Sequence, residues 1–338
     1  MGTMSDGAGH PETALIARLS GLIRSALDPL LAGEDRVALV DFPNHPNAGD
    51  SAIWLGQLRY LKEKGTSLAY TCEMRSFSAR RLVRALPSGT VLLSGGGNLG
   101  DLWPTFEEFR ERIVSSLPDH RLIQLPQTIE FASDAALARA ADLFSAHGNF
   151  TMLVRDAQSL AVARGTFGLP AALAPDMAFA LGTLPRPRPE RSVVLLARGD
   201  IESVGGASES GSDWPSYASS GLAYPVIRKS SKIAGRVSKH VPTPGSTGWR
   251  VLDRTYTLLA RERLASAVRM VSSGEVLVTD RLHGHIVAML MGVPHVLVDN
   301  SYGKLRRFHE TWTSDSTITY WAEDLDSAVE QAMSLAGD

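Results

Sequence analysis

Two histidines, an arginine and an aspartate lie close together in the segment D-R-L-H-G-H, as Asp280, Arg281, His283 and His285. A guanidinium group binds phosphate and carboxylate anions with paired hydrogen bonds. An imidazole, whose ordinary pKa is about 6.5, both gives and accepts protons near neutral pH. These residue types at this spacing therefore predict a site that holds an anion while a proton is moved.

Apolar segments on both sides predict the elements that position these side chains. Residues 276–279 are short and β-branched, which is typical of a parallel strand, and residues 286–291 are apolar enough for a helix that packs on a sheet. The polar residues then form the turn at the carboxyl end of the strand, where open α/β sheets bind ligands.

The same segment is the last of several motifs that follow one another along the chain. Before it come N-A-G-D at residues 47–50, G-G-G-N at 95–98, L-P-Q at 125–127, V-R-D at 154–156 and A-P-D-M-A-F at 174–179. Each of them occurs by chance in unrelated proteins, but the ordered set resembles the polysaccharide pyruvyltransferase family. The resemblance implies an α/β fold of two Rossmann-like domains that face each other across a cleft, a glycosyltransferase-B-like architecture.

The resemblance also implies a reaction. The enolpyruvyl group of phosphoenolpyruvate would be transferred to two hydroxyls of one sugar, in a cell-surface polysaccharide or its lipid-linked precursor, with release of phosphate. The donor carries a phosphate and a carboxylate, so its site needs guanidinium groups and backbone amides for two anions. Protonation of the methylene carbon makes its neighbour electrophilic, which requires a general acid. This chemistry needs neither a metal nor a redox cofactor.

In the family, the arginine and histidine that match Arg281 and His283 belong to the donor site. The resemblance therefore assigns Arg281 to the phosphate or carboxylate and His283 to acid–base catalysis. Further donor-binding residues are expected to be Arg198, His285, Lys304, Gly96, Gly97 and Asn98. His285 is equally consistent with a hydrogen-bonded core histidine, the glycines with a tight turn, and Asp280 with a helix cap.

The acceptor sugar is expected to contact Asp50, Asn47 and Gln127, which follow or flank strand ends in the first half of the chain. Asp50 has a second interpretation, because an aspartate before residues 51–64 is typical of a helix cap. The glycine run is expected to form a loop whose backbone approaches a ligand closely.

Length and composition agree with two domains. The 338 residues exceed a typical single domain, and 44% hydrophobic with 21% charged residues is ordinary for a globular protein. The predicted organisation is a disordered N-terminus (1–11), an N-terminal Rossmann-like domain on the acceptor side (12–182), a proline-rich linker (183–191), a C-terminal Rossmann-like domain on the donor side (192–321) and a closing helix (322–338). Residues 201–250 are rich in Ser and Gly and predict a long loop, either solvated and flexible or a lid that recognises the acceptor.

Charge and cysteine content exclude several classes of protein. A net charge of −2 argues against a nucleic-acid binder, and the single cysteine, Cys72, excludes an internal disulfide framework. No Cys and His cluster has the spacing of metal ligands, so no metal is expected. Without an apolar run of membrane-spanning length or a signal-like N-terminus, we expect a cytoplasmic protein that contacts the inner face of the membrane where a lipid-linked acceptor would lie.

Two other functions are consistent with the same architecture. A nucleotide-sugar-dependent glycosyltransferase would use Arg281 for a diphosphate, but it would need an acidic residue at a strand end for the ribose, and no convincing one is present. An inert glycan-binding scaffold would keep the fold without turnover.

Overall fold

The computed structural model describes residues 9–197, 213–214, 225–230, 247–299 and 303–337. It divides into two compact units, which are discontinuous in sequence, unlike the predicted domains. The N-terminal unit consists of Leu22–Ala180 and Tyr217–Arg263, and the C-terminal unit of Met1–Gly21, Leu181–Ser216 and Leu264–Asp338. Arg198 and most of the predicted loop at 201–250 lie outside the described residues. The facing arrangement of the domains stays a prediction.

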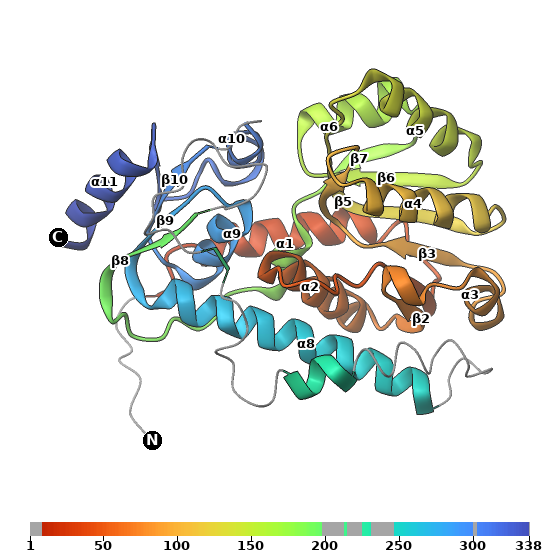
Figure 1. Ribbon diagram of the computed structural model, residues 1–338, viewed down its shortest axis with the longest axis horizontal. Helices are drawn as coiled ribbons and strands as arrows, with labels where there is room; N and C mark the ends of the chain where they lie inside the picture. Colours follow the sequence, from red (N-terminus) through yellow and green to blue (C-terminus); the bar gives the residue numbers. More distant parts are fainter. Residues whose placement is uncertain (1–8, 198–212, 215–224, 231–246, 300–302, 338) are drawn as a thin grey trace. The chain divides into compact units, whose positions relative to one another are not determined.

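The N-terminal unit contains a seven-stranded parallel sheet in the order β2-β1-β3-β5-β6-β7, with β4 paired beside β5 (Figure 1). The strands are β1 (Arg36–Val40), β2 (Ser67–Cys72), β3 (Thr90–Leu93), β4 (Gly96–Leu99), β5 (Arg121–Ile129), β6 (Phe150–Val154) and β7 (Ala171–Leu173). The helices are α2 (Ala48–Lys64), α3 (Ala79–Ala85), α4 (Pro104–Ser116), α5 (Asp134–Ala146) and α6 (Ala157–Ala161), and α1 (Thr13–Leu27) ends in this unit.

The strand order reverses between β1 and β3. From β1 the chain moves outward to β2, whereas from β3 it moves in the other direction to β5 and β6. Crossovers between parallel strands are right-handed, which places the connecting helices of the two directions on opposite faces of the sheet. A crevice forms at such a reversal, beyond the carboxyl ends of the strands, and it is the expected binding position in a doubly wound sheet.

Helix α2 begins at a side-chain cap, but the capping residue differs from the prediction. Asn47 accepts hydrogen bonds from the backbone amides of Gly49 and Asp50, and Gly65 ends the helix in the left-handed conformation. Asp50 is therefore in the first turn of α2, not at its cap, because the helix starts at Ala48 instead of Ser51.

The glycine run is a strand where a loop was expected. Gly96–Leu99 forms β4, which pairs with β5 through Gly96 and Leu99. Glycine has a low strand propensity, so that only the pairing with the long neighbouring strand stabilises an extended conformation here.

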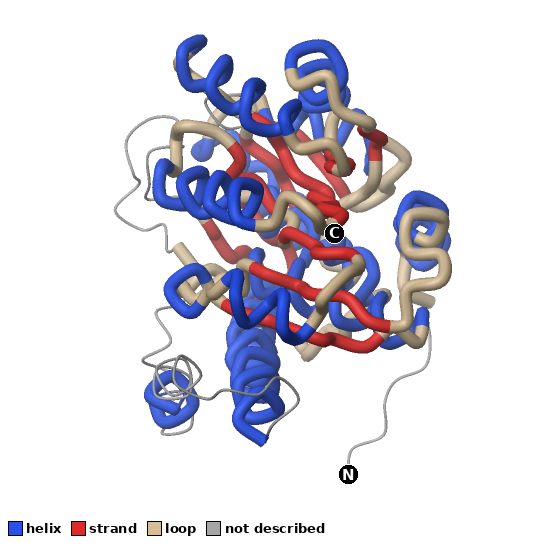
Figure 2. The backbone as a smooth tube through the Cα atoms, turned by 90° about the vertical axis from the view of Figure 1, so that its right-hand side faces the viewer, coloured by secondary structure: helices blue, strands red, loops and turns tan. Residues whose placement is uncertain are grey.

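The C-terminal unit contains a four-stranded parallel sheet in the order β11-β10-β9-β8. Its elements are β8 (Arg191–Leu196), β9 (Gly274–Thr279), α9 (Leu282–Met291), β10 (His295–Val298), α10 (Lys304–Phe308), β11 (Thr319–Ala322) and α11 (Leu325–Gly337). Figure 2 shows these strands and the larger sheet in red among blue helices.

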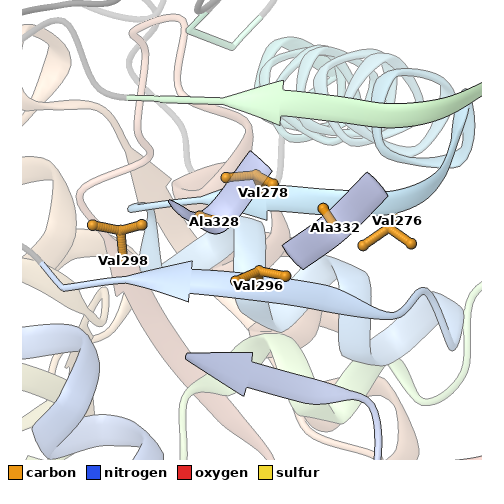
Figure 3. Packing of buried hydrophobic residues seen from close by; sticks show 6 residues of the cluster. All are labelled: Val276, Val278, Val296, Val298, Ala328 and Ala332. Carbon is orange, nitrogen blue, oxygen red and sulfur yellow. The ribbon is translucent and has the colours of Figure 1, made fainter. Parts of the chain in front are cut away.

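Helix α11 covers one face of the smaller sheet. Valines of β9 and β10 meet two alanines of the helix in a buried cluster (Figure 3), which consists of Val276, Val278, Val296, Val298, Ala328 and Ala332. The small alanine side chains allow the helix to approach the β-branched strand surface closely. The predicted closing helix is present, although it starts three residues later, after the additional strand β11.

Helix α8 (Thr247–Ser272) was not predicted from the sequence. Its 26 residues begin inside the predicted loop, and residues 225–230 are helical as well, so the loop prediction is wrong for these parts of the chain. The chain start was also predicted to be disordered through residue 11, yet Nε2 of His10 lies 3.0 Å from the carbonyl oxygen of Leu290 within the C-terminal unit.

Among the residues that the structure describes, none of the helices combines the length and the apolar character that a membrane crossing needs.

Candidate functional site

A small pocket, open to solvent, lies where the strand order of the larger sheet reverses. Residues that follow β1, together with a residue in the first turn of α2, form one side of the pocket. Residues that follow β3 form the other side. We call it the switch-point pocket; its lining residues are Asp41, Pro43, His45, Asp50, Ser94, Gly95, Asn98 and Phe106. Asp50 and Asn98 were predicted from the sequence to bind ligands, whereas Asp41 and His45 were not.

Asp41 directly follows β1 and has an unusual backbone conformation. Its φ angle is 71°, the only positive φ at a non-glycine position in the described part of the chain. Burial raises the pKa of its carboxyl group to about 6, an effect that Arg110 opposes and that Asp50 and Glu73 reinforce. A carboxyl group with such a pKa changes its protonation state close to neutral pH, as acid–base catalysts do.

His45 and Asp50 form a polar pair in the same pocket. The Nε2 atom of His45 lies 3.5 Å from Oδ2 of Asp50, and the imidazole ring meets the ring of Phe106 edge to face at 5.7 Å. Burial lowers the pKa of His45 despite the neighbouring carboxylate. His45 is therefore mainly neutral at pH 7 and can act as a hydrogen-bond partner for a hydroxyl group.

The side chain of Asn98 is held by two buried neighbours. Its Oδ1 atom accepts hydrogen bonds from Arg110 at 3.0 Å and from Nε2 of Gln127 at 2.9 Å. Arg110 in turn donates to Gln124 and to Glu107. Because Oδ1 is occupied in this way, the Nδ2 amide is the group with which Asn98 can donate to a ligand in the pocket.

Two of the predicted acceptor residues support the pocket instead of lining it. Asn47 caps α2 and so orients Asp50, and Gln127 is fully buried and holds Asn98. Contact of Asn47 and Gln127 with a sugar stays a prediction that the geometry does not favour.

The glycines of the G-G-G-N motif allow a close approach of backbone segments. A Cβ atom on Gly95 would lie 2.6 Å from the carbonyl oxygen of Pro126, so this position excludes any larger residue. Gly96 has a φ angle of 147°, and a Cβ atom there would point at the side chains of Gln127 and Asp50. Gly97 is in β4 beside them.

In the C-terminal unit, Arg281 occupies the N-cap position of α9 at the carboxyl end of β9. Its backbone amide donates to Oγ1 of Thr279 at 3.1 Å, and its guanidinium group forms an ion pair with Asp213. Arg281 is buried, whereas the Asp213 side chain is 45% exposed. The predicted cap, Asp280, is one residue too early, because the helix starts at Leu282.

His283 is in the first turn of α9 and is partly exposed. The glycine between the two histidines of D-R-L-H-G-H explains how this turn packs on the sheet. A Cβ atom on Gly284 would lie 2.5 Å from Oγ1 of Thr279, so only glycine lets α9 start this close to the end of β9. Arg281 and His283 therefore follow the strand end as predicted.

His285 is fully buried, and both of its ring nitrogens have partners. Nδ1 lies 2.6 Å from Nε2 of His295, and Nε2 lies 2.8 Å from Oγ1 of Thr313. Burial holds the pKa of His285 well below its usual value, and it lowers that of His295 to about 4. This geometry favours the core alternative for His285. His295 was missed because it stands inside the apolar strand H-V-L-V.

Two predicted donor residues remain, Lys304 and Arg198, and the structure describes only Lys304. Lys304 is the first residue of α10, half-buried, after Gly303 in the left-handed conformation. Arg198 lies outside the described residues. Clusters of three or more His, Cys, Asp or Glu that could hold a metal ion are absent from the described ranges.

The motifs V-R-D and A-P-D-M-A-F have a structural role. Arg155 forms an ion pair with Asp176, and both side chains are almost completely buried. Arg155 also donates to Oγ1 of Thr128, while Asp156 caps α6 by accepting from the amide of Ser159. These contacts connect β6, β5 and the segment after β7.

Parallel sheets with polar side chains beyond the carboxyl ends of their strands define a Rossmann-like α/β protein. Comparison with known proteins then identifies the family. The family model for "Polysaccharide pyruvyl transferase" matches residues 47–302. The chain belongs to this family and is a transferase.

Individual relatives agree with the family match. "Pyruvyl transferase 1" of Schizosaccharomyces pombe is 31% identical over 329 residues, which cover 94% of this chain and 79% of that protein. "Putative pyruvyl transferase EpsO" of Bacillus subtilis is 30% identical over 314 residues, with 90% and 92% covered. A crystal structure of a functionally uncharacterised protein from Klebsiella pneumoniae has a similar fold, with a TM-score of 0.59, 18% identity and coverage of 89% of this chain and 99% of that one.

Proposed function

We propose that the chain transfers the enolpyruvyl group of phosphoenolpyruvate to two hydroxyls of one sugar, which forms a pyruvate ketal and releases phosphate. The observation that carries the proposal is the position of Arg281 and His283, an anion-binding group and a proton carrier, within one turn of a strand end inside the region matched by the family. The sugar belongs to a polysaccharide or to its lipid-linked precursor, which the enzyme meets at the inner face of the membrane.

Arg281 binds the phosphate or the carboxylate of the donor. Its ion pair with Asp213 supports this role, because it shows that the guanidinium group accepts an anionic partner at this position. The start of α9 adds the partial positive charge of a helix N-terminus. Lys304, at the start of α10, supplies a further cation for the second anionic group of the donor.

His283 donates the proton to the methylene carbon of the donor. Protonation turns the neighbouring carbon into an oxocarbenium-like electrophile, which an acceptor hydroxyl attacks. Phosphate leaves, and the second hydroxyl of the same sugar closes the ring. Histidine is a common general acid and base in enzymes.

The acceptor sugar binds in the switch-point pocket. Asp50 and His45 accept hydrogen bonds from sugar hydroxyls, and the Nδ2 amide of Asn98 donates one. The pocket offers donors and acceptors without a strong positive charge, as recognition of a neutral diol requires. Asn98 was predicted for the donor, but its place beside Asp50 supports a contact with the acceptor.

Thermal unfolding in the presence of candidate donors tests the proposal, because a ligand that binds only the native state raises the melting temperature. We expect stabilisation by phosphoenolpyruvate and none by uridine, guanosine or cytidine diphosphate sugars. Release of phosphate from phosphoenolpyruvate, measured with a panel of methyl hexopyranosides, then reports turnover. Stabilisation by a nucleotide sugar alone would point to glycosyl transfer, and binding of glycans without any turnover would point to an inert scaffold.

A further inference from the structure

We propose that Asp41 is the general base that takes the proton from the attacking hydroxyl of the acceptor in the switch-point pocket. This inference rests on the proposed pyruvyl transfer and adds a catalytic residue to it. It follows from the position of Asp41, from the way its backbone is held, and from the charges that surround its carboxyl group.

Asp41 lies at a position where doubly wound α/β proteins bind ligands. It directly follows β1 at the reversal of strand order and lines the pocket together with Asp50 and Asn98. A left-handed backbone at a non-glycine residue is uncommon and costs free energy, and such conformations cluster at functional sites.

The residue that follows Asp41 holds this conformation in place. Phe42 is buried and donates its backbone amide to the carbonyl oxygen of Cys72 at 2.9 Å. Its ring stacks on Tyr256 with centroids 4.1 Å apart and meets Trp54 edge to face at 5.2 Å. Packing of Phe42 against Tyr256 and Trp54 therefore holds the backbone next to Asp41 in place, as the positioning of a proton acceptor requires.

The charged groups around Asp41 come from four parts of the N-terminal unit. Asp50 on α2 and Glu73 after β2 raise the pKa of Asp41, and Arg110 on α4 lowers it, while burial has the largest effect and brings it to about 6. His45 is in the same pocket. At neutral pH the carboxylate is thus mainly ionised, yet more basic than an ordinary aspartate.

Other acidic groups in the neighbourhood already have partners. Asp50 lies 3.5 Å from His45, and Oε2 of Glu73 accepts a hydrogen bond from Asn44 at 3.2 Å. Glu107 and Arg110 form a buried ion pair. Asp41 is the pocket-lining carboxyl group whose surroundings favour uptake of a proton.

The proton balance of the reaction is complete with this assignment. The first sugar hydroxyl forms a bond to the central carbon of the donor while its proton passes to Asp41, and the methylene carbon becomes a methyl group by taking up one proton. The bond between that central carbon and the phosphate oxygen breaks as the second hydroxyl attacks and loses its proton. The two sugar hydroxyls release two protons in total. One replaces the proton that the methyl group has taken up, and the other leaves with hydrogen phosphate.

Steady-state kinetics of the full-length enzyme tests the inference, with phosphoenolpyruvate and the best methyl hexopyranoside of the panel. We expect Asp41→Asn to lower kcat by about 100-fold or more, the range of general-base catalysis, while KM for the sugar stays within about threefold. Asp50→Asn should mainly raise KM. Glu63→Gln, a surface substitution at the far end of α2, is the matched control with wild-type kinetics.

The pH profile separates a base from a structural residue. In the wild type kcat/KM should rise with pH through about 6, because the carboxylate must be ionised, and this rise should be absent from the residual activity of Asp41→Asn. Stabilisation of Asp41→Asn by phosphoenolpyruvate checks that the variant is folded and binds the donor.

These experiments distinguish failure of the proposed function from failure of the role of Asp41 alone. A wild-type enzyme that releases no phosphate with any sugar of the panel overturns the proposed function and the role of Asp41 with it. Turnover by the wild type together with an unchanged kcat in Asp41→Asn, or with the same pH profile in both, overturns the role of Asp41 alone.

Discussion

Nδ1 of His285 and Nε2 of His295 lie 2.6 Å apart in the interior of the C-terminal unit, and their tautomers follow from the neighbouring groups. Nδ1 of His295 lies 2.8 Å from the carbonyl oxygen of Val293, which only accepts, so this nitrogen carries the proton. Nε2 of the neutral His295 then accepts from His285, whose other nitrogen accepts from the hydroxyl of Thr313. The sequence left a donor contact and a core role equally open for His285, and the network favours the core role.

Replacement of His285 by alanine should therefore affect stability and not donor binding. We expect a loss of about 2–4 kcal/mol in the free energy of unfolding, because a buried cavity forms and Nε2 of His295 keeps only the hydroxyl of Thr319, 3.1 Å away, as a partner. Urea unfolding measures the loss. Stabilisation by phosphoenolpyruvate should persist in the variant, and its disappearance would instead support the predicted donor contact of His285.

The same pair predicts a decline of stability in acid. Both histidines are neutral in the fold with lowered pKa values, so that below pH 6.5 the unfolded chain takes up protons that the folded chain does not. Each such histidine should reduce the free energy of unfolding by about 1.4 kcal/mol per pH unit as the pH falls from 6.5 toward 4. Urea midpoints across this range provide the measurement. An equal slope in wild type and His285→Ala would contradict the prediction.

Asp41→Asn should stabilise the protein above pH 6. The pKa of Asp41 is raised in the folded state, so ionisation of its carboxyl group destabilises the fold. The stability that the protonated group contributes is fully present at low pH and is lost as the pH rises through about 6. Allowing for the solvent screening of this half-buried group, we expect a gain of about 1–2 kcal/mol at neutral pH. The gain should shrink toward pH 4. A gain that is independent of pH would reflect only the backbone preference of asparagine.

Asp213→Asn should tighten donor binding. Under the proposed function, the donor competes with the Asp213 carboxylate for Arg281, and because Asp213 is 45% exposed, the ion pair contributes only a modest free energy. We expect the Kd for phosphoenolpyruvate to fall by about two- to fivefold. Isothermal titration calorimetry measures the change, with Arg281→Ala, which should abolish binding, as its counterpart. Weaker binding in Asp213→Asn would mean that Asp213 orients Arg281 for the donor.

His283→Ala should keep donor binding and lose the chemical step. In the proposed reaction the imidazole acts on a carbon atom only during the chemical step, so its removal should lower kcat by about 100-fold or more. Phosphate release and calorimetric titration, measured on the same preparation, separate the two effects. Loss of affinity as large as that in Arg281→Ala would reverse the roles of the two residues.

Apolar runs made most of the parallel strands predictable. Runs such as those of β1, β3 and β9 are short, β-branched and bounded by polar turns, and buried parallel strands require this pattern. Helix α8 was not predicted because its start overlaps a Ser- and Gly-rich segment, a composition that is typical of loops. Strand β4 was missed because its first two residues are glycines, which have no intrinsic preference for an extended conformation.

The candidate site was predictable where a sequence motif carries a residue, as for Arg281 and His283, and also for Asp50 and Asn98. Asp41 stands in no such motif and meets Ser94 only through the pairing of β1 with β3. Neither the positive φ angle of Asp41 nor its raised pKa leaves a trace in the sequence, since both arise from the surrounding fold.

The close approach of Gly95 to Pro126 also limits how the enzyme can be redesigned. Any side chain at Gly95 would collide with the backbone of β5, so this lining position of the pocket tolerates no substitution. Under the proposed function, acceptor preference is therefore better altered at Phe106 and His45, which line the pocket with side chains that can be shortened or enlarged. A mutant library for new glycan substrates is best confined to these two positions.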